Sequence, residues 1–139
     1  MPQILIYHTH SQETFVDSRE GKEEDTIVGV GNYLTDLLEE KYGYQVIHVT
    51  DAFDMMGGTL DRSKAYDYAR TSIEKVLEEN PTVEVVIDLH RDGVPDDRRL
   101  VTEVNGKSTA QLLFYNGLSY TVSQGACLLY TSDAADDKA

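Results

Sequence analysis

Two short segments of the sequence carry the side chains best suited to hydrolytic chemistry. His8, His10 and Glu13 lie in the segment His-Thr-His-Ser-Gln-Glu near the start, and His90 lies in the segment Asp-Leu-His-Arg-Asp. Two imidazoles and one carboxylate with an open fourth position are the typical ligand set of a catalytic zinc ion. We therefore take His10, Glu13 and His90 as the ligands of a candidate zinc site.

Other polar residues in the same two segments are candidates for supporting roles. His8, Asp88 or Asp92 could orient the ring nitrogens of the ligating histidines, as outer partners of metal ligands commonly do. Arg91 is the only basic residue next to either segment. This scarcity of basic side chains argues against a phosphatase, because phosphate recognition relies on converging Arg and Lys.

Short apolar runs and helical spacings predict the elements that position these residues. The order is strand, helix, strand, helix, strand, with predicted ranges of Gln3–Tyr7, Thr26–Tyr42, Val46–Val49, Arg62–Glu79 and Val83–Leu89. This order predicts an α/β fold whose mostly parallel sheet has helices on both faces. In such sheets ligands bind beyond the carboxyl ends of the strands. Both histidine segments follow predicted strands, so they converge if the first and third strands are neighbours.

The ends of the predicted elements have recognisable signals. Asp25 or Thr26 is placed to cap the first helix and Gly43 to end it, and Asn80-Pro81 ends the second helix. Further along, the sequence predicts a hairpin with strands at 100–104 and 110–115 and an Asn-Gly turn at 105–106.

The remaining polar residues are interpreted as structural or solvated. His48 lies inside a predicted strand, and Asp51, Asp54 and Asp61 form a loose acidic group in a loop. The acidic run at 20–25 leads into a helix N-terminus, where negative charge is favoured.

Composition bounds the class of protein. The chain has 139 residues, 25 acidic against 12 basic side chains, a formal net charge of −13 and 40% hydrophobic residues. This length suits one globular domain, and the negative charge argues against nucleic acid as a partner. The single Cys, Cys127, excludes a disulfide framework and multi-cysteine metal sites. No apolar run approaches the roughly 18 residues of a membrane span.

Several collinear segments resemble the stage II sporulation protein P family between about residues 2 and 125. The segments that carry the resemblance are Ile4–Glu13, Val28–Leu34, Leu60–Tyr66, Val86–Gly93 and Phe114–Ser119. That family is similar to the zinc N-acetylmuramoyl-L-alanine amidases of bacterial cell walls, whose fold is a three-layer α/β sandwich. The resemblance implies zinc-dependent cleavage of the amide between the muramic acid lactyl group and the stem peptide, with endopeptidase activity also credited to members.

The resemblance also implies site residues, partners and a location. The zinc ligands fall on His10, Glu13 and His90, with His8 as an alternative to His10 and Glu24 as an alternative to Glu13. The implied partners are peptidoglycan and the stage II sporulation proteins D and M. The implied location is extracytoplasmic, between the mother-cell and forespore membranes, with an N-terminal membrane anchor in full-length members that is absent here.

The sequence departs from the family near its end. The family's catalytic glutamate lies in a late strand, and nothing after Ser119 resembles that strand. Residues 127–139 resemble a translated sequencing adapter, so we expect a partial amidase-like domain at 1–126, incomplete at its C-terminus, followed by a non-native tail. The first hypothesis is therefore a domain that binds zinc but is inactive, and the alternative is a catalytically silent module that binds peptidoglycan or a partner protein.

Overall fold

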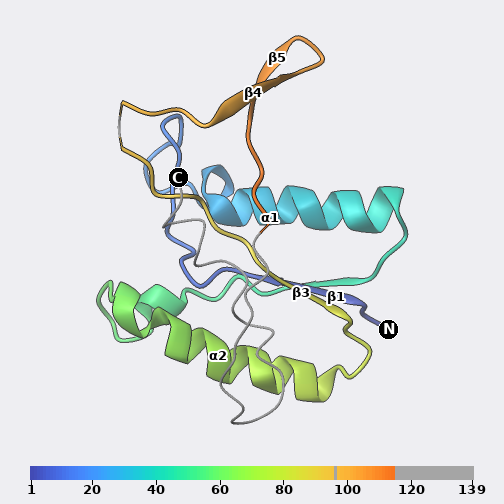
Figure 1. Ribbon diagram of the computed structural model, residues 1–139. Helices are drawn as coiled ribbons and strands as arrows, with labels where there is room; N and C mark the ends of the chain where they lie inside the picture. Colours follow the sequence, from blue (N-terminus) through green and yellow to red (C-terminus); the bar gives the residue numbers. More distant parts are fainter. Residues whose placement is uncertain (96, 115–139) are drawn as a thin grey trace, which may run out of the picture. The chain divides into compact units, whose positions relative to one another are not determined.

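The computed structural model describes residues 1–95 and 97–114, and its first compact unit, Met1–Arg91, is a three-layer sandwich. A parallel three-stranded sheet has the order β2-β1-β3, with bounds β1 Ile4–Tyr7, β2 Val46–His48 and β3 Val85–Asp88. Helices α1, Ile27–Asp36, and α2, Arg62–Glu79, cover opposite faces of this sheet (Figure 1). The predicted α/β fold with a parallel sheet is confirmed.

The core of this unit surrounds β1. All four residues of this central strand are buried, as expected for a strand that has neighbours on both sides and a helix on each face. The helices add small or branched side chains at helical spacing: Ile27 and Val28 from α1, and Ala65, Ala69 and Ile73 from α2.

The strand register brings the ends of β1 and β3 to the same point. Tyr7 lies opposite Asp88 in the parallel ladder, and the N–H of Leu89 donates to the carbonyl of Tyr7 at 2.9 Å. The segments that follow the two strands therefore leave the sheet side by side. The first and third strands are neighbours, so the condition for convergence of the two histidine segments is met.

Local signals fix the helix boundaries. Thr26 is the cap of α1, because its hydroxyl accepts a hydrogen bond from the N–H of Val28 at 3.2 Å. The helix continues as a π-helical turn, η2, at Leu37–Lys41, and Gly43 follows with a φ of 72°. Asp61 caps α2 at the N–H groups of Ser63 and Lys64. Two short 3₁₀ turns, η1 at Glu23–Asp25 and η3 at Phe53–Met55, lie in the loops.

The second compact unit begins at Asp92 and contains a hairpin of β4, Val101–Val104, and β5, Lys107–Ala110. The predicted second strand at 110–115 is wrong in position. Asn105 and Gly106 both have positive φ, so they form a two-residue turn that pairs Val104 directly with Lys107.

The predicted domain boundary at 126, Cys127 and the tail at 127–139 lie outside the described residues. None of the helices in the described ranges is long and apolar enough to cross a membrane.

Candidate functional site

Asp88, the last residue of β3, links the ends of the two neighbouring strands. Its carboxylate accepts hydrogen bonds from the backbone N–H of Thr9 at 3.0 Å and from the Thr9 hydroxyl at 2.5 Å. The same carboxylate also contacts His90, whose Nε2 lies 2.9 Å from Asp88 Oδ2. Asp88 therefore fixes the chain after β1 and orients the His90 ring at once.

Glu13 reaches the same place from the loop after β1. Its Oε2 accepts a hydrogen bond from the backbone N–H of Arg91 at 2.7 Å, and its Oε1 lies 3.9 Å from His90 Nδ1. The carbonyl of Glu13 accepts from the N–H of Ile27 at 3.0 Å, and this anchors the loop to the start of α1. Burial opposes ionisation of Glu13, but the contacts with His90 and Arg91 outweigh it and lower the pKa of this carboxyl.

His90 lies between two carboxylates and is strongly biased toward its charged form. Burial alone would lower the pKa of the ring, but the hydrogen bonds and charges of Asp88 and Glu13 raise it to about 10. The same pairing lowers the pKa of Asp88 against the opposing effect of its burial. In the absence of a metal, the cluster is therefore a buried network of one imidazolium and two carboxylates.

His10 is the second imidazole of the cluster. Its ring packs edge-on against His90, with ring centroids 5.4 Å apart, and against Tyr66 of α2 at 5.2 Å. Burial, together with the nearby charges of Arg62 and His90, lowers the pKa of His10, so its ring is neutral. The buried Nδ1 of His10 has no hydrogen-bond partner among the described residues. An unpartnered, neutral ring nitrogen is the form in which histidine binds a metal ion.

His8 belongs to a different group from His10. Its Nδ1 donates to the carbonyl of Leu89 at 2.9 Å, and its Nε2 lies 2.7 Å from His48 Nε2 beneath Gly31 of α1. Burial lowers the pKa of His8 to about 4. Both ring nitrogens therefore have partners, and the bond of Nδ1 holds the segment just before His90. His8 supports the site through the backbone of Leu89, while His48, interpreted as structural from the sequence, is its hydrogen-bond partner.

Two residues of the cluster were missed by the sequence interpretation. Asp54, interpreted from the sequence as part of a solvated loop, is only 1% exposed and accepts a 3.4 Å hydrogen bond from the Ser11 hydroxyl. Its charge offsets a small part of the lowering of the His10 pKa. Arg62, at the start of α2, places Nη2 at 3.2 Å from Glu13 Oε1. The sequence signal for Asp54 was its place next to Phe53, an aromatic residue that is fully buried.

The other predicted residues lie elsewhere or have a partial role. Glu24, the alternative to Glu13, has a largely exposed side chain that pairs with the exposed Arg19. Arg91 contributes its backbone N–H to the cluster, and its side chain is exposed. Asp92 is the first residue of the second compact unit, so its supporting role stays a prediction.

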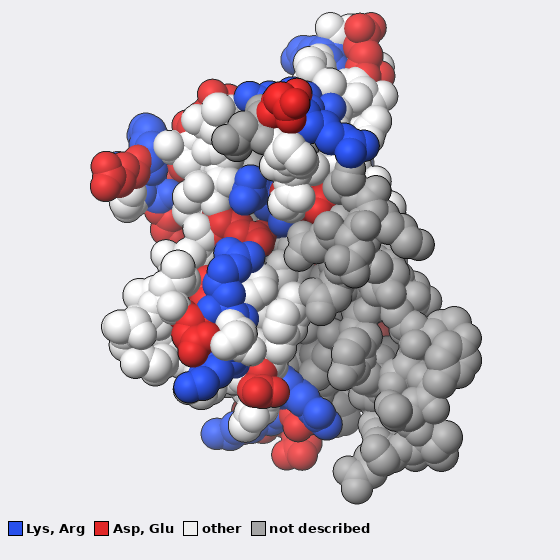
Figure 2. Space-filling view, turned by 60° about the vertical axis from the view of Figure 1, so that its left-hand side comes forward, with Lys and Arg blue, Asp and Glu red and all other residues white. Residues whose placement is uncertain are grey.

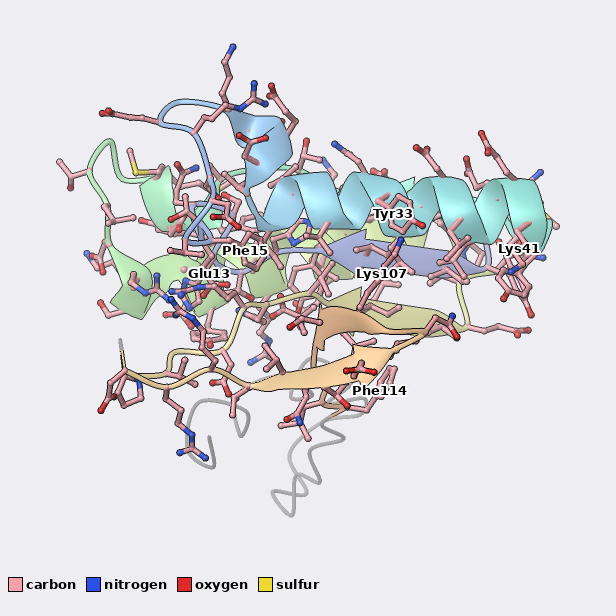
Figure 3. The ribbon with its side chains drawn as sticks, turned by 90° about the horizontal axis from the view of Figure 1, so that it is seen from above. Glu13, Phe15, Tyr33, Lys41, Lys107 and Phe114 are labelled. Atoms are coloured by element: carbon pink, nitrogen blue, oxygen red, sulfur yellow. The ribbon has the colours of Figure 1, made fainter. Side chains whose placement is uncertain are left out.

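The structure brings together His10, Glu13 and His90, the three proposed ligands. These three residues lie at one end of the sheet, and Lys41 lies at the other end. Figure 3 shows this for the labelled Glu13.

Comparisons with known proteins identify the family of the chain. The model of the stage II sporulation protein P family matches residues 1–123. The chain belongs to this family. A curated relative, stage II sporulation protein P of Bacillus subtilis strain 168, is 25% identical over 123 residues, which cover 82% of this chain and 30% of the relative. The chain thus spans about a third of the length of that relative. No solved structure matches the chain.

Membership of the stage II sporulation protein P family supports a role connected with sporulation and the cell wall. The donor atoms of the cluster fit a zinc ion in their chemistry, and the unpartnered Nδ1 of His10 is the clearest sign of this. As placed, no three His, Cys, Asp or Glu side chains of the described residues are arranged to hold a metal ion. In this arrangement His90 and Glu13 contact each other, and they also contact Asp88, Arg62 and Arg91.

Proposed function

We propose that this chain is the zinc-binding part of a cell-wall hydrolase that cleaves the N-acetylmuramoyl-L-alanine amide bond of peptidoglycan. The observation that supports the proposal most is the convergence of His10, Glu13 and His90 beyond the carboxyl ends of β1 and β3. All three side chains are largely buried, and the two histidine rings are in contact. Membership of the sporulation family supports peptidoglycan as the substrate.

In this proposal His10, Glu13 and His90 would hold a zinc ion, which would supply Lewis-acid polarisation of the scissile carbonyl and activation of water. Asp88 keeps His90 in a fixed orientation, because its own position is fixed by two hydrogen bonds from Thr9. Burial of the cluster keeps bulk water away from the donors. The general base is proposed to be a glutamate from a late strand of the full-length family members, which this chain does not supply.

The wider context is also a proposal. In the whole protein we place the activity outside the cytoplasm, between the mother-cell and forespore membranes, on a membrane-anchored chain. The proposed partners are peptidoglycan and the stage II sporulation proteins D and M. The net negative charge of the chain argues against nucleic acid as a further partner.

Zinc titration of the full chain tests the proposed ligands. We expect the protein to bind about one zinc ion, and we expect His10→Ala and His90→Ala each to weaken binding by at least about 100-fold, since each removes one of three ligands. His48→Ala is the matched control, because His48 is also partly buried and has a lowered pKa but lies in the His8 group. If neither ligand variant weakens binding, the ligand assignment is wrong.

Incubation with purified peptidoglycan tests the enzymatic part. We expect no release of stem peptides by this chain, because the proposed general base is missing. Robust hydrolysis that is lost in His90→Ala would contradict the missing-glutamate argument. Protein that binds peptidoglycan without stoichiometric zinc would favour the alternative, a catalytically silent binding module.

A further inference from the structure

Arg62 connects the buried cluster with the solvent. Its Nη2 lies 3.2 Å from Oε1 of Glu13, whose side chain is 5% exposed, while the Arg62 side chain itself is 54% exposed. Among the described residues, it is the only Lys or Arg that forms an ion pair with the cluster. On the face that Figure 2 shows, basic and acidic side chains are otherwise interspersed, without a large field of one sign.

Glu13 has partners other than Arg62. Its Oε2 accepts from the N–H of Arg91 at 2.7 Å, and its Oε1 also faces the charged ring of His90 at 3.9 Å. A guanidinium has five N–H donors in a planar fork, and the contact with Glu13 uses one nitrogen of Arg62. Arg62 therefore has the capacity to bind a second oxyanion without leaving Glu13 unpaired.

The anion contact at this place comes from the Arg62 side chain and not from the helix end. The first free N–H groups of α2, those of Ser63 and Lys64, are occupied by the side chain of Asp61. The ammonium group of Lys64 lies 3.9 Å from the same carboxylate. An anion that approaches the cluster at the start of α2 therefore meets the guanidinium first.

We propose that Arg62 binds a carboxylate of the substrate, and that the substrate is a peptide with a free carboxylate near the scissile amide. This inference rests on the proposed function, since it assigns a substrate group to the same site. A carboxylate fits the fork of a guanidinium with two parallel hydrogen bonds. It also carries one charge, whereas a phosphate dianion would be repelled more strongly by the nearby carboxylates of Glu13, Asp54 and Asp88.

Binding of a matched pair of soluble peptides to the full, zinc-supplemented chain tests the proposal. The probes are N-acetyl-alanyl-glutamate and its diamide, followed by NMR titration. We expect the dicarboxylate to bind about tenfold more tightly than the diamide, since a charge-assisted hydrogen bond contributes about that factor. Arg62→Met should abolish this preference, and Arg62→Lys should retain part of it because the charge remains without the fork.

Arg70→Met is the control, because Arg70 lies on the same helix, is exposed and pairs with Glu74 at 2.9 Å. This variant removes the same charge and should keep the preference for the dicarboxylate. An equal preference in wild type and Arg62→Met would overturn the proposal. Stronger competition with the peptide by inorganic phosphate than by acetate would also overturn the proposal, because the site would then favour phosphate.

Zinc titration of the same proteins separates this proposal from the proposed function. Arg62→Met should still bind about one zinc ion, because Arg62 is not a ligand and its removal frees an oxygen of Glu13. Loss of the peptide preference with intact zinc binding supports the role of Arg62. A wild type that prefers the dicarboxylate but binds no zinc would refute the zinc hydrolase and leave an Arg62-dependent anion contact.

Discussion

The backbone N–H of Arg91 donates to the Glu13 carboxylate at 2.7 Å, and this bond joins the loop after β1 to the loop after β3. The two residues are 78 positions apart in the sequence. Because the acceptor is a buried, ionised carboxylate, the bond is a charge-assisted one and fixes both loops relative to each other. The positions of His10 and His90, which lie on these loops, depend on it.

Replacement of Glu13 by Gln should therefore destabilise the protein. Gln cannot satisfy the two positively charged partners of Glu13, Arg62 and His90, so we expect a loss of about 2 kcal/mol in the free energy of unfolding. The measurement is urea denaturation in the presence of a chelator. Glu20→Gln, at an exposed position in the same loop, is the control and should change stability by less than about 0.5 kcal/mol. Equal effects of the two substitutions would show that the Glu13 network does not stabilise the fold.

Gly31 of α1 packs directly against the His8–His48 pair. A Cβ at this position would lie 2.5 Å from His48 Nε2 and 2.7 Å from His8 Nε2. Gly31→Ala should therefore cost about 1–3 kcal/mol, although Ala favours a helix over Gly by about 1 kcal/mol. Thermal denaturation checks this.

Two further variants test the cause of that loss. Gly57→Ala should be tolerated, because no atom lies within 4 Å of the added Cβ. Adding His48→Ala to Gly31→Ala should recover part of the stability, because removal of the His48 ring makes room. A double variant that is no more stable than Gly31→Ala alone would place the clash elsewhere.

The lowered pKa of His8, about 4 against an ordinary value near 6.5, makes stability depend on pH. Between these values the unfolded chain binds a proton that the folded chain does not, so stability falls as the pH falls. From pH 7 to pH 5 we expect His8 to account for a loss of about 2 kcal/mol. The raised pKa of His90 acts in the opposite direction, because its contribution is fully present below pH 6.5 and is lost only as the pH rises through about 10.

Urea denaturation at the two pH values, in wild type and His8→Gln, isolates this effect. The variant lacks the titrating group but keeps a side chain that can hydrogen-bond. Wild type should lose about 2 kcal/mol more than the variant between pH 7 and pH 5. The same loss in both proteins would mean that His8 does not remain neutral in the folded state.

Zinc binding at the proposed site should release a proton from His90. A histidine binds zinc only through an unprotonated nitrogen, and the pKa of His90 is raised to about 10, so its ring is charged at pH 7–8. His10 is neutral in this range and releases none. Titration calorimetry in two buffers with different ionisation enthalpies should give at least about one proton released per zinc ion, because ionisation of a zinc-bound water with a pKa near 7 would add to the proton from His90. A value near zero would contradict either the charged state of His90 or its assignment as a ligand.

Local patterns in the sequence were sufficient for the elements of the first unit. The range of α2 and the Gly43 stop depend on residues within a few positions of each other, and both were predicted. The cap of α1 was narrowed to Asp25 or Thr26, and the structure shows Thr26. The second strand of the hairpin lies at Lys107–Ala110 and not at the predicted 110–115, because a two-residue turn pairs the residues directly on either side of it. The positive φ of Asn105 and Gly106 determines the register there.

The sequence by itself also placed His10, Glu13 and His90 after strands whose carboxyl ends lie on one edge of a parallel sheet. It left open whether those two strands are neighbours, and the strand order β2-β1-β3 of the structure decides this. Only the tertiary structure decided which atoms meet. Arg62 reaches Glu13 across 49 positions, Asp54 is buried despite its acidic loop, and His8 turns to His48 while His10 turns to His90. Helix and strand periods depend on nearby residues, whereas burial and ion pairing depend on which distant segments pack together.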